Sequence, residues 1–302
     1  MNTRPILAAA LVAALVPATA HAGRPIDETR PLDARGMVKV ENLKGSIEVR
    51  AWDRSEVKIE GVLGDGVEKL EIEGGGKRLH VRVRYPARRG LLGADRRIGP
   101  TTLRLMVPLQ ADLDLQAVAA DVTAWGVAPG SLKIDNVSGR TTVAGAPREV
   151  EVDTVSGDVD LTVNRASVQV DSVSGNIRIS GRLGPEIEVE SVSGDIELRA
   201  VQTALERVEG ASVSGDMRVQ GALSPRARVQ LESVSGDIAL RLPRGTSAEL
   251  RAESFSGSLR APGATVERPR HGPGSSLRQR YGDGEAEVSI ETFSGDADVR
   301  MD

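Results

Sequence analysis

The sequence contains no cysteine among its 302 residues, and aromatic residues make up only 2% of it. Without cysteine the chain can form no disulfide, thiolate metal site, cysteine nucleophile or lipidated amino-terminal cysteine. The few aromatic residues, two each of Trp, Tyr and Phe, argue against a stacking platform for single-stranded nucleic acid. With a formal net charge of −4, the chain also lacks the excess of basic residues that nucleic-acid binding needs. We therefore expect no nucleic-acid partner.

Histidine is nearly as scarce, with three in the chain. A serine nucleophile needs a positioned base, and histidine is the commonest one. Beyond His80 the chain has only His271, which lies outside the repeats described below. The sequence therefore argues against nucleophilic catalysis, and we expect no catalytic residues.

Long apolar runs are also rare, and the one from Ile6 to Val16 follows a short basic start. Pro17 ends this run, and Ala20-His21-Ala22 is a small-x-small cleavage site. This layout predicts a secretory signal peptide over residues 1–22, cleaved between Ala22 and Gly23; a buried helix is the alternative. The run is too short to span a membrane. We expect an exported protein, periplasmic or extracellular, with no membrane span.

What the chain has is a repeated hexapeptide, [Asp/Glu]-[Ser/Thr]-[Val/Phe]-Ser-Gly-[Asp/Asn/Ser]. Clear copies begin at residues 153, 171, 190 and 232, and looser copies begin at 135, 211, 253 and 291. The repeated glycines predict structural corners at Gly139, Gly157, Gly175, Gly194, Gly215, Gly236, Gly257 and Gly295. Six of the seven gaps between them are 18 to 21 residues, and the last is 38. A faded copy places Ala120 at the glycine position, and residues 42–46 resemble another decayed copy.

Segments between the hexapeptides alternate apolar and polar residues, which is typical of half-buried strands. Val168 and Val170 have even numbers, whereas Val173, Ile177 and Ile179 have odd ones. We interpret this as a change of inward face near residues 171–172, with the hexapeptide valines pointing into the core.

Units that cannot bury their own apolar face stack on their neighbours. The sequence thus predicts an all-β fold, a single-chain parallel β-solenoid (β-helix) of about 18–21 residues per coil. Stacking of about nine coils at about 4.8 Å each would make a rod of roughly 40 Å. An antiparallel meander with a hexapeptide at each hairpin tip is the rival fold.

The expected organisation has four parts: a signal peptide (1–22), an extended leader (23–35), a strand-rich region that starts or caps the stack (36–110), and the solenoid (111–302). The long last gap is interpreted as two coils, or as one coil with a loop insertion at residues 264–283. That loop and an earlier one are rich in arginine. One interpretation is that both are solvated loops. The other is that they contact an anionic envelope polymer or a protein partner. The contact candidates are Arg88, Arg89, Arg96, Arg97, Arg268, Arg270, Arg278 and Arg280.

Stacked coils would turn the acidic positions into columns in which like charges repel by around 1 kcal/mol even in water. The aspartates after glycine can accept backbone N–H bonds at the corners, as Asp commonly does in turns. The alternative is Ca²⁺ bound along this edge, with candidates Asp158, Asp195, Asp216 and Asp237. No other cofactor is expected.

The export signal, the segment Asn42 to Trp52 (Asn-x-x-Gly-Ser-Ile-x-Val-x-x-Trp) and the serial Val-Ser-Gly-Asp corners resemble the bacterial DUF4097 "putative adhesin" family of β-strand repeats. The resemblance covers about residues 36–302. It implies a solenoid-like protein that is exported or associated with the envelope, and some relatives belong to envelope stress-response systems. It supplies no catalytic residues.

We therefore expect a non-catalytic, adhesin-like structural or binding protein of the bacterial envelope. One alternative is a polysaccharide-active parallel β-helix enzyme; another is an envelope stress-response component that acts through a protein partner. An enzyme would need a carboxylate pair that does not repeat, whereas these acids recur on every coil.

Overall fold

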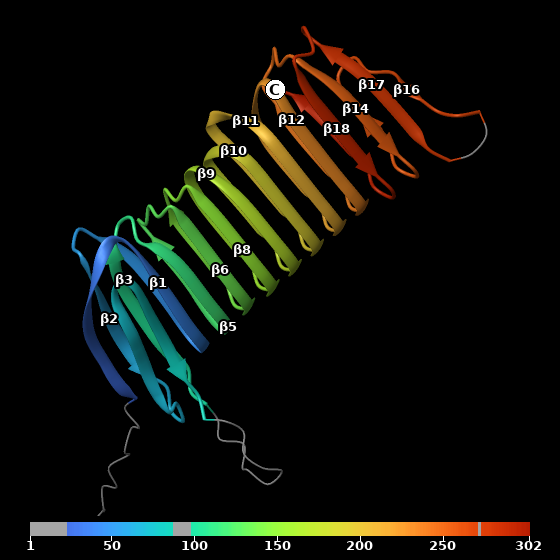
Figure 1. The fold of residues 1–302 in the computed structure, drawn as a ribbon. Helices are drawn as coiled ribbons and strands as arrows, with labels where there is room; N and C mark the ends of the chain where they lie inside the picture. The colour runs from blue at the N-terminus through green and yellow to red at the C-terminus, as the bar shows by residue number, and fades with distance from the viewer. Residues whose placement is uncertain (1–22, 87–97, 271–272) are drawn as a thin grey trace, which may run out of the picture.

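The computed structural model describes residues 23–86, 98–270 and 273–302. The described chain forms nineteen strands that are joined by hydrogen bonds into one sheet, which winds into a rod (Figure 1). The predicted all-β solenoid is confirmed. None of the described residues belongs to a helix of the length and apolarity needed to cross a membrane. The predicted signal peptide lies outside the described residues.

The middle of the rod consists of parallel strands stacked in register. Ser191, for example, pairs with Ser172 on one side and with Ser212 on the other. Hexapeptides therefore lie directly over one another, which excludes the antiparallel meander. These strands are β5 (Asp112–Trp125), β6 (Ser131–Ser138), β7 (Thr141–Gly145), β8 (Glu149–Ser156), β9 (Val159–Ser174), β10 (Ile177–Ser193), β11 (Ile196–Ser214), β12 (Met217–Ser235) and β13 (Ile238–Leu242).

At the amino-terminal end the chain doubles back over its first coil. The strands here are β1 (Arg24–Trp52), β2 (Glu56–Leu63), β3 (Lys69–Arg84) and β4 (Thr101–Pro108). The later part of β1 lies between β5 on one side and β3 and β4 on the other. Its first residues, expected as a loose leader, pair antiparallel with β2. Gly45 pairs with Ala120, so both decayed corners join the stack.

At the carboxyl-terminal end the coils are stacked out of sequence order. The strands are β14 (Ala248–Ser254), β15 (Leu259–Arg260), β16 (Val266–Glu267), β17 (Ser275–Tyr281), β18 (Ala286–Thr292) and β19 (Ala297–Met301). β18 pairs with β12 on one side and with β14 on the other. The last coil of the sequence therefore lies between the coil of β12 and the coil of β14 (Figure 1). The expected loop at residues 264–283 contains β16 and β17, and β17 pairs antiparallel with β14.

The core is a set of aliphatic columns, to which each coil contributes from two strands. Val168 and Val170 point inward before the corner, as do Ile177 and Ile179 after it. The expected inward position of Val173 is wrong: Val173 is 48% exposed, and the neighbouring Ser172 is buried. The inward face changes at the Ser-Gly-Asn corner that follows, three residues later than the sequence suggested, because alternation continues through Ser172.

Glycine is required at the corner because the coils approach closely there. Gly175 has φ +122°, and a Cβ on it would lie 2.2 Å from the carbonyl oxygen of Gly157. The same contact links every hexapeptide glycine to its neighbour in the stack. We call this continuous file the glycine column.

Candidate functional site

The outward hexapeptide position forms a row of exposed apolar side chains along the rod, which we call the valine row. Its members are between 40% and 55% exposed, and they are Leu43, Val118, Val137, Val155, Val173, Val192, Val213, Val234, Phe293 and Phe255. The two phenylalanines end the row with their rings stacked, centroids 4.7 Å apart. Sequence reasoning missed this row because it assigned the apolar residues of the hexapeptide to the core.

All members of the valine row except Phe255 line a groove of about 1260 Å³, which we call the axial groove. Each coil from β8 to β12 contributes three consecutive residues, the first three of its hexapeptide, for example Asp171, Ser172 and Val173. The first and third project outward on the same face of the strand, whereas the second is buried. The groove is therefore lined by an apolar row and, beside it, by the mostly acidic first hexapeptide position.

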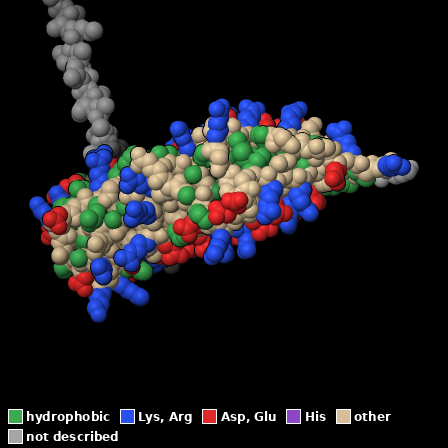
Figure 2. Space-filling model, turned by 90° about the horizontal axis from the view of Figure 1, so that it is seen from above, with side chains coloured by type: hydrophobic (Ala, Val, Ile, Leu, Met, Phe, Trp, Pro, Cys, Tyr) green, Lys and Arg blue, Asp and Glu red, His purple; other side chains and the backbone are tan. Residues whose placement is uncertain are grey.

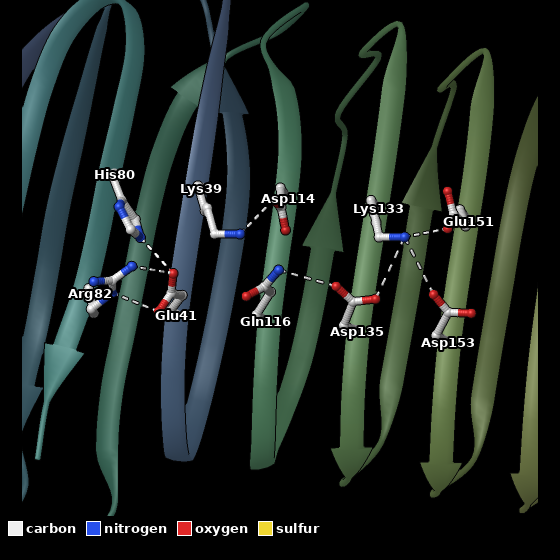
Figure 3. A network of polar contacts seen from close by, with 10 residues as sticks. All are labelled: Lys39, Glu41, His80, Arg82, Asp114, Gln116, Lys133, Asp135, Glu151 and Asp153. Atoms are coloured by element: carbon white, nitrogen blue, oxygen red, sulfur yellow. Dashed lines mark hydrogen bonds and ion pairs between the residues drawn. The ribbon is translucent and has the colours of Figure 1, made fainter.

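At the amino-terminal end of the groove, Glu41 is paired with Arg82 and also contacts His80 (Figure 3). Arg82 Nε lies 2.7 Å from Glu41, and His80 Nε2 lies 2.8 Å from the same carboxylate. The hydrogen bond from Arg82 is the main cause that lowers the pKa of Glu41, and His80 adds to it.

The next acids along the groove share one lysine. The Lys133 ammonium lies 3.8 Å from Asp135 and 3.5 Å from Asp153, and it also pairs with Glu151 (Figure 3). Burial, and then the neighbouring Asp153, raise the pKa of Asp135. The hydrogen bond from Lys133 to Glu151 raises the pKa of the lysine. This part of the groove is therefore electrostatically compensated.

The central part of the groove is not compensated. Four acids that line it form no ion pair with a described residue: Asp171, Glu190, Glu232 and Glu291. We call these four residues the central acids. Two of the four, Asp171 and Glu232, accept hydrogen bonds from neutral glutamines. Glu188 stands beside Glu190 on β10 but outside the groove lining, and Arg207 pairs with Glu186 at 3.6 Å. Burial, and then the nearby Glu209, Glu190 and Asp171, raise the pKa of Glu188.

The aspartates after glycine have a different role. The Oδ1 atom of Asp195 accepts the backbone N–H of Asp216 at 3.0 Å, and Asp216 does the same for Asp237 at 3.1 Å. The Ca²⁺ candidates Asp158, Asp195, Asp216 and Asp237 all belong to this ladder, which joins each coil to the next. Within the described residues, no group of three or more His, Cys, Asp or Glu is placed to hold a metal ion.

Those predicted arginine contacts that the structure describes do not line the axial groove. Arg88, Arg89, Arg96 and Arg97 lie outside the described residues, as does Ala22, whereas Gly23 directly precedes β1. Arg268 and Arg270 are exposed after β16, and Arg278 and Arg280 are exposed on β17 at the end of the rod. On the face that Figure 2 shows, Lys and Arg side chains are spread along the length of the rod rather than gathered at one site.

A family model described as Toastrack DUF4097 matches residues 46–300. No curated protein matches the chain. Among solved structures, a "putative lipid binding protein" from Parabacteroides distasonis is 14% identical, with a TM-score of 0.48, and the match covers 92% of this chain and 98% of that one. A "putative adhesin" from Bacteroides fragilis is 11% identical, with a TM-score of 0.40 and coverage of 92% and 97%.

Proposed function

Because the chain belongs to the Toastrack DUF4097 family, as its sequence predicted, we propose that it is an exported, non-catalytic binding protein of the bacterial envelope. In this proposal the solenoid is a rigid rod, and the axial groove is the surface that holds its partner. The partner is a component of the envelope, and an envelope stress-response system is one setting for such a protein.

The valine row carries this proposal. An exposed aliphatic side chain on a single coil would need no explanation, but this one recurs on coil after coil in one uninterrupted row. Contiguous apolar surface rimmed by polar groups marks an interaction site on soluble proteins. The row contributes nothing to the buried core, so its role lies at the surface.

The arrangement of acids supports binding rather than catalysis. A glycosidase positions two carboxylates at one scissile bond, one of them as a proton donor. Here the acids form columns along the rod, and those after glycine bond to the backbone of the next coil. The polysaccharide-active alternative is tested by incubating the protein with polygalacturonate and related polymers; new reducing ends would establish an enzyme.

The binding proposal is tested by capture from envelope fractions. The chain from Gly23 onward is immobilised, and bound components are identified by mass spectrometry. We expect components that the unaltered protein retains to be lost from a Val173→Asn, Val192→Asn, Val213→Asn variant. These side chains are exposed, so the fold should persist.

The matched control replaces exposed valines outside the groove, Val62→Asn with Val201→Asn. It should retain the same components as the unaltered protein. Equal capture by both variants would contradict the assignment of the groove as the binding surface.

A further inference from the structure

We propose that the axial groove holds a cationic amphipathic α-helix of a partner polypeptide. This inference rests on the proposed function, because it names the chemistry of the partner that the groove binds. It follows from three features of the groove: its charge, its length and the kind of surface that lines it.

The charge of the central groove selects a cationic partner. The lining acids Asp171, Glu190 and Glu232 have no cation within ion-pair distance among the described residues, whereas Glu41, Asp135 and Asp153 do. Just outside the lining, Glu188 stands beside Glu190 on β10, and its pKa is raised by burial and by the nearby Glu209, Glu190 and Asp171. Lys or Arg side chains from a partner would relieve the repulsion and form complementary pairs.

The length of the groove suits a helix of ordinary size. The uncompensated stretch from Asp171 to Glu291 covers five stacked coils, which is four steps of about 4.8 Å or roughly 19 Å. At 1.5 Å per residue, a helix of about 13 residues spans that distance. The full valine row is about twice as long, so longer helices also fit.

The lining favours a helix over an extended peptide. Groove side chains stand on a sheet whose backbone groups are already paired between coils, so an extended peptide would find no partners for its own N–H and C=O groups. A helix satisfies these groups internally and presents apolar residues about 5–6 Å apart along one face. That spacing is close to the step between coils, and an amphipathic helix in an apolar groove is a common recognition mode.

Two other occupants fit the groove less well. A second copy docked symmetrically would place one set of central acids against the other, which is repulsive. A lipid with an anionic headgroup would meet the same acids. Preferential binding of vesicles that contain anionic lipid is one of the outcomes of the experiment below.

The test uses three labelled 18-residue peptides and the chain from Gly23 onward. The first peptide has a leucine face with lysines along its flank, the second replaces lysine with glutamate, and the third scrambles the first. Binding is followed by fluorescence anisotropy, and helix formation by circular dichroism. We expect the first peptide alone to bind and become helical, with affinity falling as salt increases.

Variants of the groove locate the binding. Glu190→Gln with Glu232→Gln should weaken affinity about fivefold, and Val192→Asn with Val213→Asn about tenfold. The charge-matched control, Glu206→Gln with Glu285→Gln, alters exposed acids that do not line the groove. It should change affinity less than about twofold.

Equal binding of the scrambled or glutamate peptide, or equal losses in the control, would overturn the cationic helix. So would the absence of any binding, or preferential binding of vesicles that contain anionic lipid. If envelope components still bind through the valine row while the cationic helix does not, this inference falls and the proposed function stands. Loss of both would overturn both.

Discussion

Each hexapeptide glycine lies where the corner of one coil meets the backbone of the next. At Gly194 the φ angle is +132°, and an added Cβ would lie 2.1 Å from the carbonyl oxygen of Gly175. Two separate requirements therefore apply at one residue, an unusual backbone angle and the absence of a side chain. The corners of successive coils can approach each other this closely because both requirements are met on one coil after another.

We expect Gly194→Ala to lower the free energy of unfolding by roughly 2–4 kcal/mol, because the methyl group must displace a backbone carbonyl. Urea denaturation measures this. Gly126→Ala is the matched control, since Gly126 has φ +68° with nothing within 4 Å of an added Cβ. It should cost about 1–2 kcal/mol. Equal losses would show that backbone angle alone explains the glycine column.

The aspartates after the glycines act chiefly as hydrogen-bond acceptors for the next coil, although Asp158, Asp195 and Asp216 also form exposed ion pairs with Arg140 or Arg218. Asn176 occupies the same ladder and accepts the N–H of Asp195 at 3.1 Å through its amide oxygen. We therefore expect Asp195→Asn to change stability by less than about 0.5 kcal/mol, whereas Asp195→Ala should cost about 1–3 kcal/mol. Thermal unfolding in excess chelator belongs in the same experiment, because a lower melting temperature would revive the Ca²⁺ alternative.

The roles of these two residue types were predictable from the sequence, whereas the outward position of the valine two residues before the glycine was not. Glycine and aspartate have few roles in a repeated corner, so their recurrence predicts turns. A repeated valine usually indicates core, and only the position of the change in inward face decides otherwise. The alternation from Val168 through Val170 continues to Ser172, so a small polar residue is buried where an apolar one was expected.

At the scale of the strand, stacking in register places like charges side by side. Glu188 pairs in register with Gln169 on β9 and with Glu209 on β11, and Glu190 follows it two residues later on the same face. Burial and these neighbours raise the pKa of Glu188 above its ordinary value of 4.5. Its ionised form is therefore less favourable in the folded chain than in the unfolded chain.

We expect Glu188→Gln to raise the melting temperature at pH 7 by about 1–3 °C, because it removes cross-strand repulsion. A raised folded-state pKa destabilises the protein fully above that pKa, and the effect fades as pH falls below the unfolded value. The gain should therefore vanish near pH 3. Differential scanning calorimetry at both pH values measures it, with Glu206→Gln as control. An equal rise in the control would point to net charge instead.

The strands themselves were predictable from the sequence, but their order at the ends of the rod was not. Period-two alternation depends only on local sequence, and it located strands along residues 36–302 except at 264–283, where a loop was expected and β16 and β17 lie. Insertion of β18 between β12 and β14 depends on which of two similar coils pairs first with β12. Both coils carry a copy of the hexapeptide. The repeat therefore predicts a solenoid but does not predict the order in which these two coils stack.

At the scale of the whole molecule, both ends of the rod are closed by chain that returns over a coil. β1 is covered by β3 and β4, and β18 with β19 is covered by β14 and β15. An open coil end would leave unpaired strand groups exposed, which favours edge-to-edge association. At the carboxyl end, β14 and β15 are joined to the rest of the rod by the inserted coil of β18 and β19. The stability of the inserted coil should therefore control the stability of this outer coil.

We expect Ile290→Ala to cost about 2–5 kcal/mol locally, because Ile290 is fully buried between Leu231 and Ala252. In a solenoid each coil contacts only its neighbours, so the loss should stay near the carboxyl end. Hydrogen exchange should show reduced protection over residues 248–260 as well as 286–301, with residues 132–171 unchanged. Ile134→Ala, in a coil near the middle of the rod, should instead reduce protection over residues 132–171 and leave residues 248–260 and 286–301 unchanged. Loss confined to residues 286–301 would show that the outer coil holds itself.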